Sequence, residues 1–385
     1  MKQIYLDNAA TTEVDLKVVK AMAPYHNERY GNASSQHLLG QEAKRALEES
    51  REVIARAIGA SREEIVFTGS GTEANNFVLK GLFFYWKDKG KNHIITTKIE
   101  HDCVLNACKW LEGQGARVSY LSVDGEGFVD LDELKNEISD ETLIVSVIHG
   151  NNEIGVIQDL GEIGKICQEK GVYFHTDACQ SFTKVALNVR GMNLDFVTLN
   201  AHKIHGPKGV GALYIKKDLK GKIDPLLHGG GHEFGLRSST ENIAGIVGFA
   251  QAVKIARSID VRGMSGLRDY LIDELLKIEG VKLNGPRGSK RLCNNINVSF
   301  GNIEGEAIGG YLDSYGISSS TGSACSSNTL EVSHVLTAIG LDKGVINTSI
   351  RLSLSKFTSR EELDYVLGVL PKIVDKLRRM SPIKI

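Results

Sequence analysis

The sequence of 385 residues has only 6 prolines, and no stretch reaches the run of about 18 apolar residues that a membrane-spanning helix needs. Residues 1–15 also lack the apolar core of a secretory signal. Basic and acidic residues nearly balance, giving a formal net charge of -1, so the basic excess typical of nucleic-acid binders is missing. These absences predict a protein with neither a membrane nor a nucleic acid as its partner.

The six cysteines form no CxxC pair and no other recognisable disulfide framework. In a chain of this length without a secretory signal, we expect free thiols and a cytoplasmic location. Glycine, by contrast, is abundant, with 41 residues. Many glycines beside few prolines indicate tight turns and close approach of the backbone to a ligand, rather than a flexible linker.

Short β-branched segments alternate with helical segments through most of the first 255 residues. We expect strands at 64–68, 92–97, 116–121, 142–148, 172–177 and 194–200. Helices are expected over 35–58, 72–88, 103–113, 130–138 and 159–170. This alternation predicts an α/β fold with a mainly parallel sheet that helices cover on both faces. Ligands of such sheets bind at the carboxyl ends of the strands.

The pattern changes near residue 257, without a Pro/Gly linker. A helix over 262–278 is followed by weak strands near 281–284 and 294–300, and residues 348–354 alternate like a third strand. Helices are expected near 304–315, 329–339 and 360–378. This part of the chain therefore predicts a smaller α+β unit.

A glycine-rich segment follows the first predicted strand and begins a helix. It reads Gly-Ser-Gly-Thr-Glu-Ala-Asn-Asn over 69–76. It matches neither GxGxxG nor GxxxxGK[ST], which disfavours a dinucleotide or nucleoside-triphosphate site. The free N–H groups of the helix could hold a monophosphate, with Thr72 as a hydroxyl donor. An ordinary Ser/Thr N-cap explains the same residues equally well.

Two further strand ends carry reactive side chains. Asp177 ends the strand at 172–177, and Lys203 follows the strand at 194–200. Taken separately, Asp177 could be a helix cap, and Lys203 could be a solvated lysine like Lys208. Together with a phosphate cradle, however, they match the needs of pyridoxal phosphate (PLP): a helix N-terminus for the phosphate, an anion for the pyridine nitrogen and a lysine for the aldehyde.

Longer motifs extend this argument into a resemblance. The motifs are YLDNAATT (5–12), YGNASS (30–35), NNEIG (151–155), TDACQ (176–180), AHKIHGPKG (201–209), HGGGHE (228–233), RSSTEN (237–242) and SSTGSACSS (319–327). With them, nearly the whole chain resembles the class V aminotransferases, and within these the cysteine desulfurases of the NifS/IscS type. The resemblance implies PLP-dependent transferase fold type I with a seven-stranded sheet. It also implies a large domain over 14–257 and a small domain formed by 1–13 and 258–385.

The resemblance assigns roles around the cofactor ring. It implies that Lys203 carries PLP as a Schiff base and that Asp177 pairs with the pyridine nitrogen. Gln180 would donate to the phenolic oxygen of the ring, which suits an amide donor. His101 would stack on the ring and relay protons, a role that an imidazole can fill near neutral pH.

The phosphate and the substrate are assigned in the same way. The residues expected to hold the phosphate are Gly71, Thr72, Asn200 and His202, and Thr240 would reach it from the second subunit of a homodimer. Asn152 would contact the cofactor and, with Arg351, grip the substrate carboxylate, Arg351 as a bidentate fork.

Cys325 decides the reaction. It lies among glycine and small polar residues, in a loop of about 317–330, where no apolar pattern explains a thiol as packing. The resemblance implies that Cys325, as thiolate, takes sulfur from L-cysteine as a persulfide, releases L-alanine and passes the sulfur to an iron–sulfur scaffold protein or to tRNA thiolation. A transient 2Fe–2S cluster on Cys325 is chemically conceivable. The other five cysteines are interpreted as packing residues.

Several alternatives stay open on the sequence. The same fold serves selenocysteine lyases and other aminotransferases, and a cofactor-free scaffold-binding protein is a third reading. Arg351 could instead make a surface ion pair. The pair His228 and His232 has a spacing that zinc sites use on helices, but the three glycines between them argue against a helix. His202 and His205 are rejected as a zinc pair in the same way.

Overall fold

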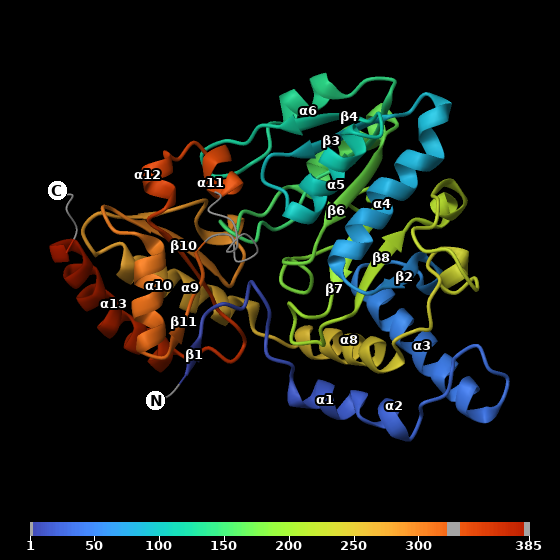
Figure 1. Ribbon diagram of the computed structural model, residues 1–385, viewed down its shortest axis with the longest axis horizontal. Coiled ribbons are helices and arrows are strands. Elements are labelled where there is room, and N and C mark those ends of the chain that lie inside the picture. The colour runs from blue at the N-terminus through green and yellow to red at the C-terminus, as the bar shows by residue number, and fades with distance from the viewer. Residues whose placement is uncertain (1–2, 322–331, 381–385) are drawn as a thin grey trace.

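The computed structural model describes residues 3–321 and 332–380, and its largest element is a seven-stranded sheet (Figure 1). The strand order is β2-β8-β7-β6-β5-β3-β4. The strands are β2 (Ile65–Thr68), β3 (His93–Thr97), β4 (Arg117–Leu121), β5 (Thr142–Ser146), β6 (Tyr173–Asp177), β7 (Phe196–Asn200) and β8 (Gly211–Ile215). Only β8 runs antiparallel to its neighbours, so the predicted mainly parallel sheet is confirmed.

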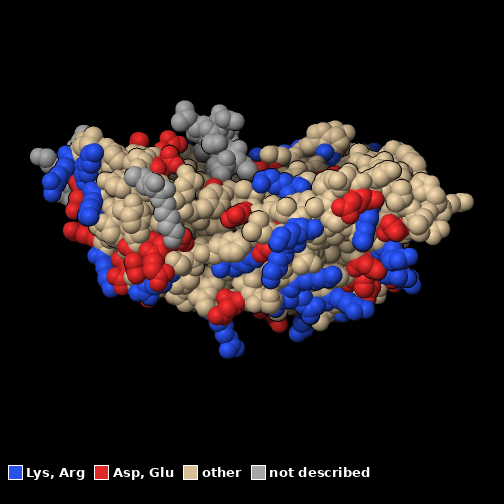
Figure 2. All heavy atoms as spheres, turned by 90° about the horizontal axis from the view of Figure 1, so that it is seen from below, with Lys and Arg blue, Asp and Glu red and all other residues tan. Residues whose placement is uncertain are grey.

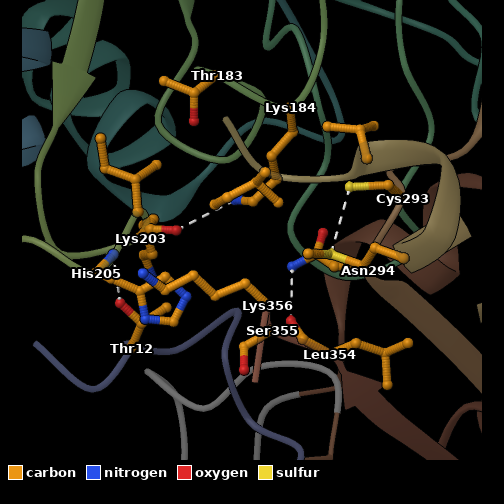
Figure 3. A pocket seen from close by; sticks show the side chains of 14 residues that line it. Thr12, Thr183, Lys184, Lys203, His205, Cys293, Asn294, Leu354, Ser355 and Lys356 are labelled. Atoms are coloured by element: carbon orange, nitrogen blue, oxygen red, sulfur yellow. Dashed lines mark hydrogen bonds between the residues drawn. The ribbon is translucent and has the colours of Figure 1, made fainter. Parts of the chain in front are cut away.

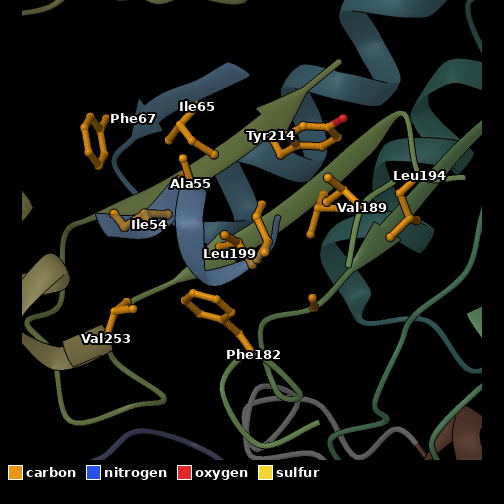
Figure 4. Close-up of a cluster of buried hydrophobic side chains, with 14 of the residues drawn as sticks. Ile54, Ala55, Ile65, Phe67, Phe182, Val189, Leu194, Leu199, Tyr214 and Val253 are labelled. Atoms are coloured by element: carbon orange, nitrogen blue, oxygen red, sulfur yellow. The ribbon is translucent and has the colours of Figure 1, made fainter. Parts of the chain in front are cut away.

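Helices cover both faces of this sheet, because successive strand residues point to opposite sides. One hydrophobic core joins the sheet to α3 (Leu38–Ala57), α7 (Leu160–Lys170) and α8 (Ile243–Ala256). In Figure 4, Ile54 of α3 and Val253 of α8 lie near Leu199 of the sheet. A second core on the other face joins it to α4 (Gly71–Trp86) and α5 (Asp102–Glu112). The remaining helices of this part are α1 (Leu16–Met22), α2 (Pro24–Asn27) and α6 (Leu131–Glu137).

Four elements of this part were not expected from the sequence patterns: α1, α2, α8 and β8. Helix α8 is mostly apolar or small, with 10 of its residues buried and only Gln251 and Lys254 as longer polar residues, so its amphipathic period is weak. Strand β8 begins at Gly211, next to a glycine-rich turn that masks it. The expected helix 35–58 begins only at Leu38, because the side chain of His37 caps it by accepting from the backbone N–H of Gly40.

A smaller antiparallel sheet forms the second part of the fold, with strand order β12-β10-β9. Its strands are β9 (Val281–Leu283), β10 (Asn295–Phe300) and β12 (Ser349–Ser353). Its helices are α9 (Val261–Leu275), α10 (Gly305–Ser314), α11 (His334–Ala338), α12 (Lys343–Ile346) and α13 (Arg360–Met380). These elements, apart from α11 and α12, share a core of their own. The expected smaller α+β unit is therefore present.

The N-terminal segment joins this second part. Strand β1 (Ile4–Tyr5) pairs in parallel with β11 (Ile317–Ser318), and Leu6 is buried in the second core. Helix α8 ends at Ala256 and α9 begins at Val261. These contacts are compatible with domains of 14–257 and of 1–13 with 258–385, a division that stays a prediction.

The surface carries both charge signs. Figure 2 shows Lys and Arg side chains interspersed with Asp and Glu over the face seen there. Within residues 3–321 and 332–380, no helix has both the length and the apolar character needed to cross a bilayer.

Candidate active site

A cavity of about 390 Å³ lies at the carboxyl ends of β6 and β7 and extends to β12 of the second part. Its volume falls in the range of about 300–1,000 Å³ that is usual for small-molecule sites. The predicted site residues that line it are Gly71, Thr72, His101, Asn152, Asp177, Gln180, Asn200, His202, Lys203 and Arg351. Within the described part of the chain, Thr240 is the only predicted site residue that does not line it. The fold therefore brings residues at the ends of strands that are far apart in the sequence together in one cavity.

Asp177 is the last residue of β6, and its carboxylate is buried, with 5% of the residue exposed. The side-chain amide of Asn75 on α4 donates to Oδ2 at 2.6 Å, and the backbone N–H of Cys179 donates to Oδ1 at 2.8 Å. Hydrogen bonds from both sides fix the orientation of the carboxylate. The alternative reading of Asp177 as a helix cap is wrong, because no helix of the structure begins there.

The N-terminus of α4 borders the cavity with Ser70, Gly71 and Thr72. Ser70 caps the helix by accepting from the backbone N–H of Glu73 at 3.1 Å, so the N-cap reading of this segment is confirmed. Gly71 is tightly enclosed, since a Cβ atom there would lie 2.6 Å from Sγ of Cys179. The backbone of the first turn can therefore approach a ligand where any side chain would collide.

Lys203 follows β7 and points its amine at the N-terminal segment. Its Nζ donates to the carbonyl oxygens of Ala9 and Ala10, the latter at 2.6 Å. The side-chain amide of Gln180 also donates to the carbonyl of Ala9, at 2.8 Å. The amine and the amide thus meet at a single carbonyl group on the cavity wall.

His202 lies beside Lys203 with Nδ1 3.2 Å from the hydroxyl of Thr11. Burial, followed by the positive charges of Lys203 and Lys208, lowers the pKa of His202 to about 4. His202 is therefore neutral near pH 7 and can offer one N–H donor to a ligand.

His101 caps α5 through its own ring. The backbone N–H of Cys103 donates to Nδ1 at 3.2 Å, and Sγ of Cys103 lies 3.1 Å from the same nitrogen. Because Nδ1 acts as an acceptor, the neutral ring carries its proton on Nε2. In the resting protein His101 is thus set up as a proton donor at Nε2.

Arg351 comes from β12 and is 2% exposed, so its reading as a surface ion pair is wrong. One guanidinium nitrogen donates to the carbonyl of Asn152 at 3.1 Å, and another pairs with the carboxylate of Asp7 at 3.0 Å. The Asp7 partner was not predicted. It shows that Arg351 already holds a carboxylate in this structure.

Two cysteines interpreted as packing residues also line the cavity. These are Cys103 and Cys179, whereas Cys108, Cys167 and Cys293 are buried in the cores. Burial, and next the charge of Asp177, raises the pKa of the Cys179 thiol well above its usual value, so this thiol stays protonated. Cys103 contacts His101 and also packs against the second core.

Further cavity residues escaped the sequence reasoning. Glu153 and His334 both line the cavity, and the hydroxyl of Ser333 donates to the buried carboxylate of Glu153 at 2.6 Å. Glu153 belongs to the NNEIG motif, which could have singled it out. His334 contacts the carbonyl of Glu100 at 2.8 Å, and no spacing in the sequence indicates this contact.

Thr240 is exposed and lies outside the cavity. Cys325, with most of the predicted loop, lies outside the described residues. Among residues 3–321 and 332–380 no group of three or more His, Cys, Asp or Glu side chains could hold a metal ion.

Known proteins provide an independent comparison. A family model described as "Aminotransferase class-V" matches residues 4–366. The chain is 49% identical to the cysteine desulfurase IscS of Dictyoglomus turgidum over 387 aligned positions, covering 100% of this chain and 97% of that protein.

Two solved structures are also similar to this chain in fold and in sequence. A structure named "NifS-like protein" has a TM-score of 0.92 at 39% identity and covers 98% of this chain and 100% of its own. Another, described as "SspA in complex with cysteine", has a TM-score of 0.84 at 36% identity and covers 93% of this chain and 100% of its own.

Proposed function

The chain is a member of the class-V aminotransferase family, and on that premise we propose that it is a PLP-dependent cysteine desulfurase. It converts L-cysteine to L-alanine and transfers the sulfur to Cys325 as a persulfide. Support comes from the IscS relative, which is similar over its whole length, and from the cysteine complex of a structural neighbour. The aminotransferase and selenocysteine lyase alternatives are not favoured, because the relative that is 49% identical to this chain is named as a cysteine desulfurase.

The residues of the cavity fit PLP in chemical type. The phosphate needs N–H and O–H donors, which the first turn of α4, Thr72, Asn200 and His202 supply. Asn200 has a buried side-chain amide whose Oδ1 lacks a hydrogen-bond partner among the described residues, and the N–H groups of its Nδ2 are the donors that a phosphate would accept from. The buried carboxylate of Asp177 suits the pyridine nitrogen and the Gln180 amide suits the phenolic oxygen.

The amine of Lys203 would hold the aldehyde of PLP. When bound, PLP withdraws electrons from the α-carbon of an amino acid. Side chains of this protein bind the substrate and transfer the protons.

Arg351 and Asn152 hold the substrate carboxylate in this proposal. The guanidinium of Arg351 is planar and prefers a bidentate carboxylate partner, a place that Asp7 takes in the structure. The substrate therefore competes with Asp7 for one side of the fork.

Proton transfer falls to Lys203 and His101. Once its amine is free, Lys203 can accept the α-proton of the substrate. His101 donates from Nε2, because Nδ1 is held by the backbone N–H of Cys103. The thiolate of Cys325 attacks the substrate sulfur, so that an S–S bond forms as the C–S bond breaks.

The single observation that carries this proposal is the convergence of Lys203, Asp177 and the α4 N-terminus on the cavity that also contains Arg351. The test is to incubate the PLP-loaded protein with L-cysteine in two arms: one contains a thiol reductant and measures alanine and sulfide, and the other omits the reductant and measures the mass of the Cys325 peptide. Equal amounts of alanine and sulfide, and a gain of one sulfur atom on Cys325, are expected. Formation of a 2-oxo acid without sulfide would instead indicate an aminotransferase.

Two variants separate the roles. Cys325→Ala is expected to keep the visible absorption of PLP but to lose sulfide release, and Lys203→Ala is expected to lose both. Cys108→Ala is the matched control, because Cys108 is buried in a core away from the cavity. Full desulfuration by Cys325→Ala would remove the assigned acceptor.

A homodimer is part of the proposal. Thr240 is exposed on its own subunit, which leaves it available to the phosphate site of a second subunit. Leu16, Tyr30 and Leu38, near the start of the chain, are large apolar residues exposed by 73%, 66% and 68%. Burial of such residues favours association, and light scattering should then give twice the chain mass of 42.0 kDa.

The sulfur acceptor is proposed to be an iron–sulfur scaffold protein, with tRNA thiolation as a second outlet. A transient 2Fe–2S cluster on Cys325 remains part of the proposal. The five cysteines that the structure describes are all free, which suits a reducing compartment such as the cytoplasm. Transfer of labelled sulfur from Cys325 to a purified scaffold protein would test the acceptor.

A further inference from the structure

Lys184 is a lysine with a partly buried side chain directly behind the site. It follows β6 in the turn after Asp177, and its Nζ donates to the carbonyl of Gln180 at 2.9 Å and to the carbonyl of Lys203 at 3.2 Å. Figure 3 shows this amine directed at the backbone of Lys203. Among the described residues, no carboxylate lies within ion-pair distance of it.

The surroundings of this amine are largely apolar. It lines a cavity of about 20 Å³ together with Met264, Cys293 and Asn294. The buried Oδ1 of Asn294 has no hydrogen-bond partner within the described part of the chain. Lys184 therefore brings a positive charge to a small cavity whose described lining contains no carboxylate.

The two carbonyl groups that Lys184 contacts belong to residues of the main cavity. Gln180 and Lys203 both line that cavity, and their side chains meet at the carbonyl of Ala9 on its wall. Their backbones meet at Lys184 on the opposite side. One amine thus connects the turn after β6 to the turn after β7, and both turns present a side chain to the cofactor.

We propose that Lys184 is a positioning residue for Lys203: it fixes the peptide of Lys203 and the turn of Gln180, and its positive charge acts on the nitrogen of Lys203. The proposal rests on the proposed function, because it gives Lys203 the cofactor. In this proposal Lys184 touches neither the substrate nor the cofactor. It sets the geometry and the electrostatic environment of Lys203, which does contact the cofactor.

Electrostatics support the second part of the proposal. The charge of Lys184 contributes to lowering the pKa of His202, which neighbours Lys203 in the chain. Burial lowers the pKa of Lys184 itself. The other titratable groups that share its small cavity are Lys203, His205 and Lys356.

The test compares three variants of the PLP-loaded protein. Lys184→Met removes charge and donors, whereas Lys184→Gln removes the charge and keeps a donor. Lys208→Met is the matched control, since Lys208 is an exposed lysine five positions after Lys203. The measurements are the dissociation constant for PLP and the pH midpoint of its visible absorption, neither of which depends on turnover.

A like charge nearby disfavours the protonated form of the nitrogen that links Lys203 to PLP. Both Lys184 variants are therefore expected to raise the pH midpoint by about half a unit or more. Lys184→Met should also weaken PLP binding about tenfold, because the two turns lose their shared donor. Lys208→Met should leave the affinity for PLP unchanged and shift the pH midpoint by less than Lys184→Met does, since solvent screens an exposed charge.

A wild-type midpoint and a wild-type PLP affinity in Lys184→Met would overturn the proposal, provided that Lys203→Ala loses the absorption band. If Lys203→Ala keeps the band, the proposed function fails together with this inference. Should Lys184→Met not fold, the midpoint of Lys184→Gln decides the question. A shift of equal size in Lys208→Met would show that any lost charge suffices and would overturn the specific role of Lys184.

Discussion

The ion pair between Arg51 and Glu233 is expected to hold the segment that leads to Thr240, and Glu233→Gln should release it. Arg51, on α3, is 2% exposed and contacts the two carboxylate oxygens of Glu233 at 2.6 and 2.8 Å. The backbone N–H of Phe67 on β2 donates to the same carboxylate at 2.7 Å. Four residues further along the segment, Arg237 pairs with Glu73 of α4 at 2.7 Å.

The backbone at this anchor is strained. Glu233 and Phe234 have φ angles of 49° and 62°, a left-handed conformation that residues other than glycine rarely adopt. Each such residue costs on the order of 1–3 kcal/mol and persists only when other contacts fix it. The ion pair provides those contacts, because the carboxylate accepts from Arg51 and from Phe67 at once.

Removal of one partner from a buried ion pair costs about 3–5 kcal/mol, because the other charge stays buried and unpaired. Glu233→Gln keeps the size of the side chain but removes its charge and one of its two acceptor oxygens, so we expect a loss of this size in the free energy of unfolding. The matched control is Glu52→Gln on α3, the helix that also carries Arg51. The exposed pair of Glu52 with Arg56 should contribute less than about 1 kcal/mol.

The assay is urea unfolding of the PLP-loaded protein, followed by far-UV circular dichroism. Glu233→Gln should also raise the rate of amide hydrogen exchange in residues 229–239. This rise is expected even if the segment detaches locally and the rest of the fold stays intact. In the double variant Arg51→Met with Glu233→Gln, the loss should be smaller than the sum of the single losses, because no charge is left unpaired. Equal losses for Glu233→Gln and Glu52→Gln, with unchanged exchange, would refute the reasoning.

Three further predictions concern Glu100, Gly71 and Cys103. Burial raises the pKa of Glu100 to about 8, so its contribution to stability is fully present below the unfolded pKa and is lost as the pH rises through about 8. Between about pH 6 and pH 9 the wild type should lose about 2–3 kcal/mol more stability than Glu100→Gln in urea unfolding, and parallel pH curves would contradict this. Gly71→Ala should weaken PLP binding about tenfold in equilibrium dialysis, because its Cβ meets Sγ of Cys179 at 2.6 Å. Cys179→Ala should restore binding in the double variant, and failure of this rescue would point to another cause. Cys103→Ala should keep desulfuration within about threefold, since the backbone N–H that holds Nδ1 of His101 remains; a loss as complete as that of Cys325→Ala would give the Cys103 thiol a direct role.

Residues at strand ends were the part of the site that local sequence patterns could identify. Asp177 and Lys203 each follow a β-branched strand, and the rule for parallel sheets places both at one edge. The same reasoning located the helix that begins at Gly71. His101 and Arg351, in contrast, were assigned by resemblance, because no local pattern separates them from an ordinary helix cap or strand residue.

Contacts between distant segments could not be predicted in this way. Asn75 gives the Asp177 carboxylate its shortest hydrogen bond, but in the sequence it is only one of two adjacent asparagines on a helix. The ion pair of Arg351 with Asp7 joins residues near opposite ends of the chain. Helix α8 was missed for a different reason, since its mostly apolar and buried sequence leaves only a weak form of the amphipathic period on which the prediction depends.

The segment from Asp7 to Thr12 shows most clearly what sequence patterns leave out. Its contribution to the amine of Lys203 is made by backbone carbonyls, which every residue possesses and no sequence pattern marks.

The same segment is bound at both ends. The backbone N–H of Ala9 donates to the hydroxyl of Ser353 on β12 at 2.8 Å, and the N–H of Thr12 donates to the carbonyl of His202 at 3.0 Å. It thereby links the strand that carries Arg351 to the turn that carries Lys203. The side chain proposed to hold the substrate carboxylate and the amine proposed to hold the cofactor are therefore spaced by one short stretch of backbone, so a displacement of that stretch must alter both together.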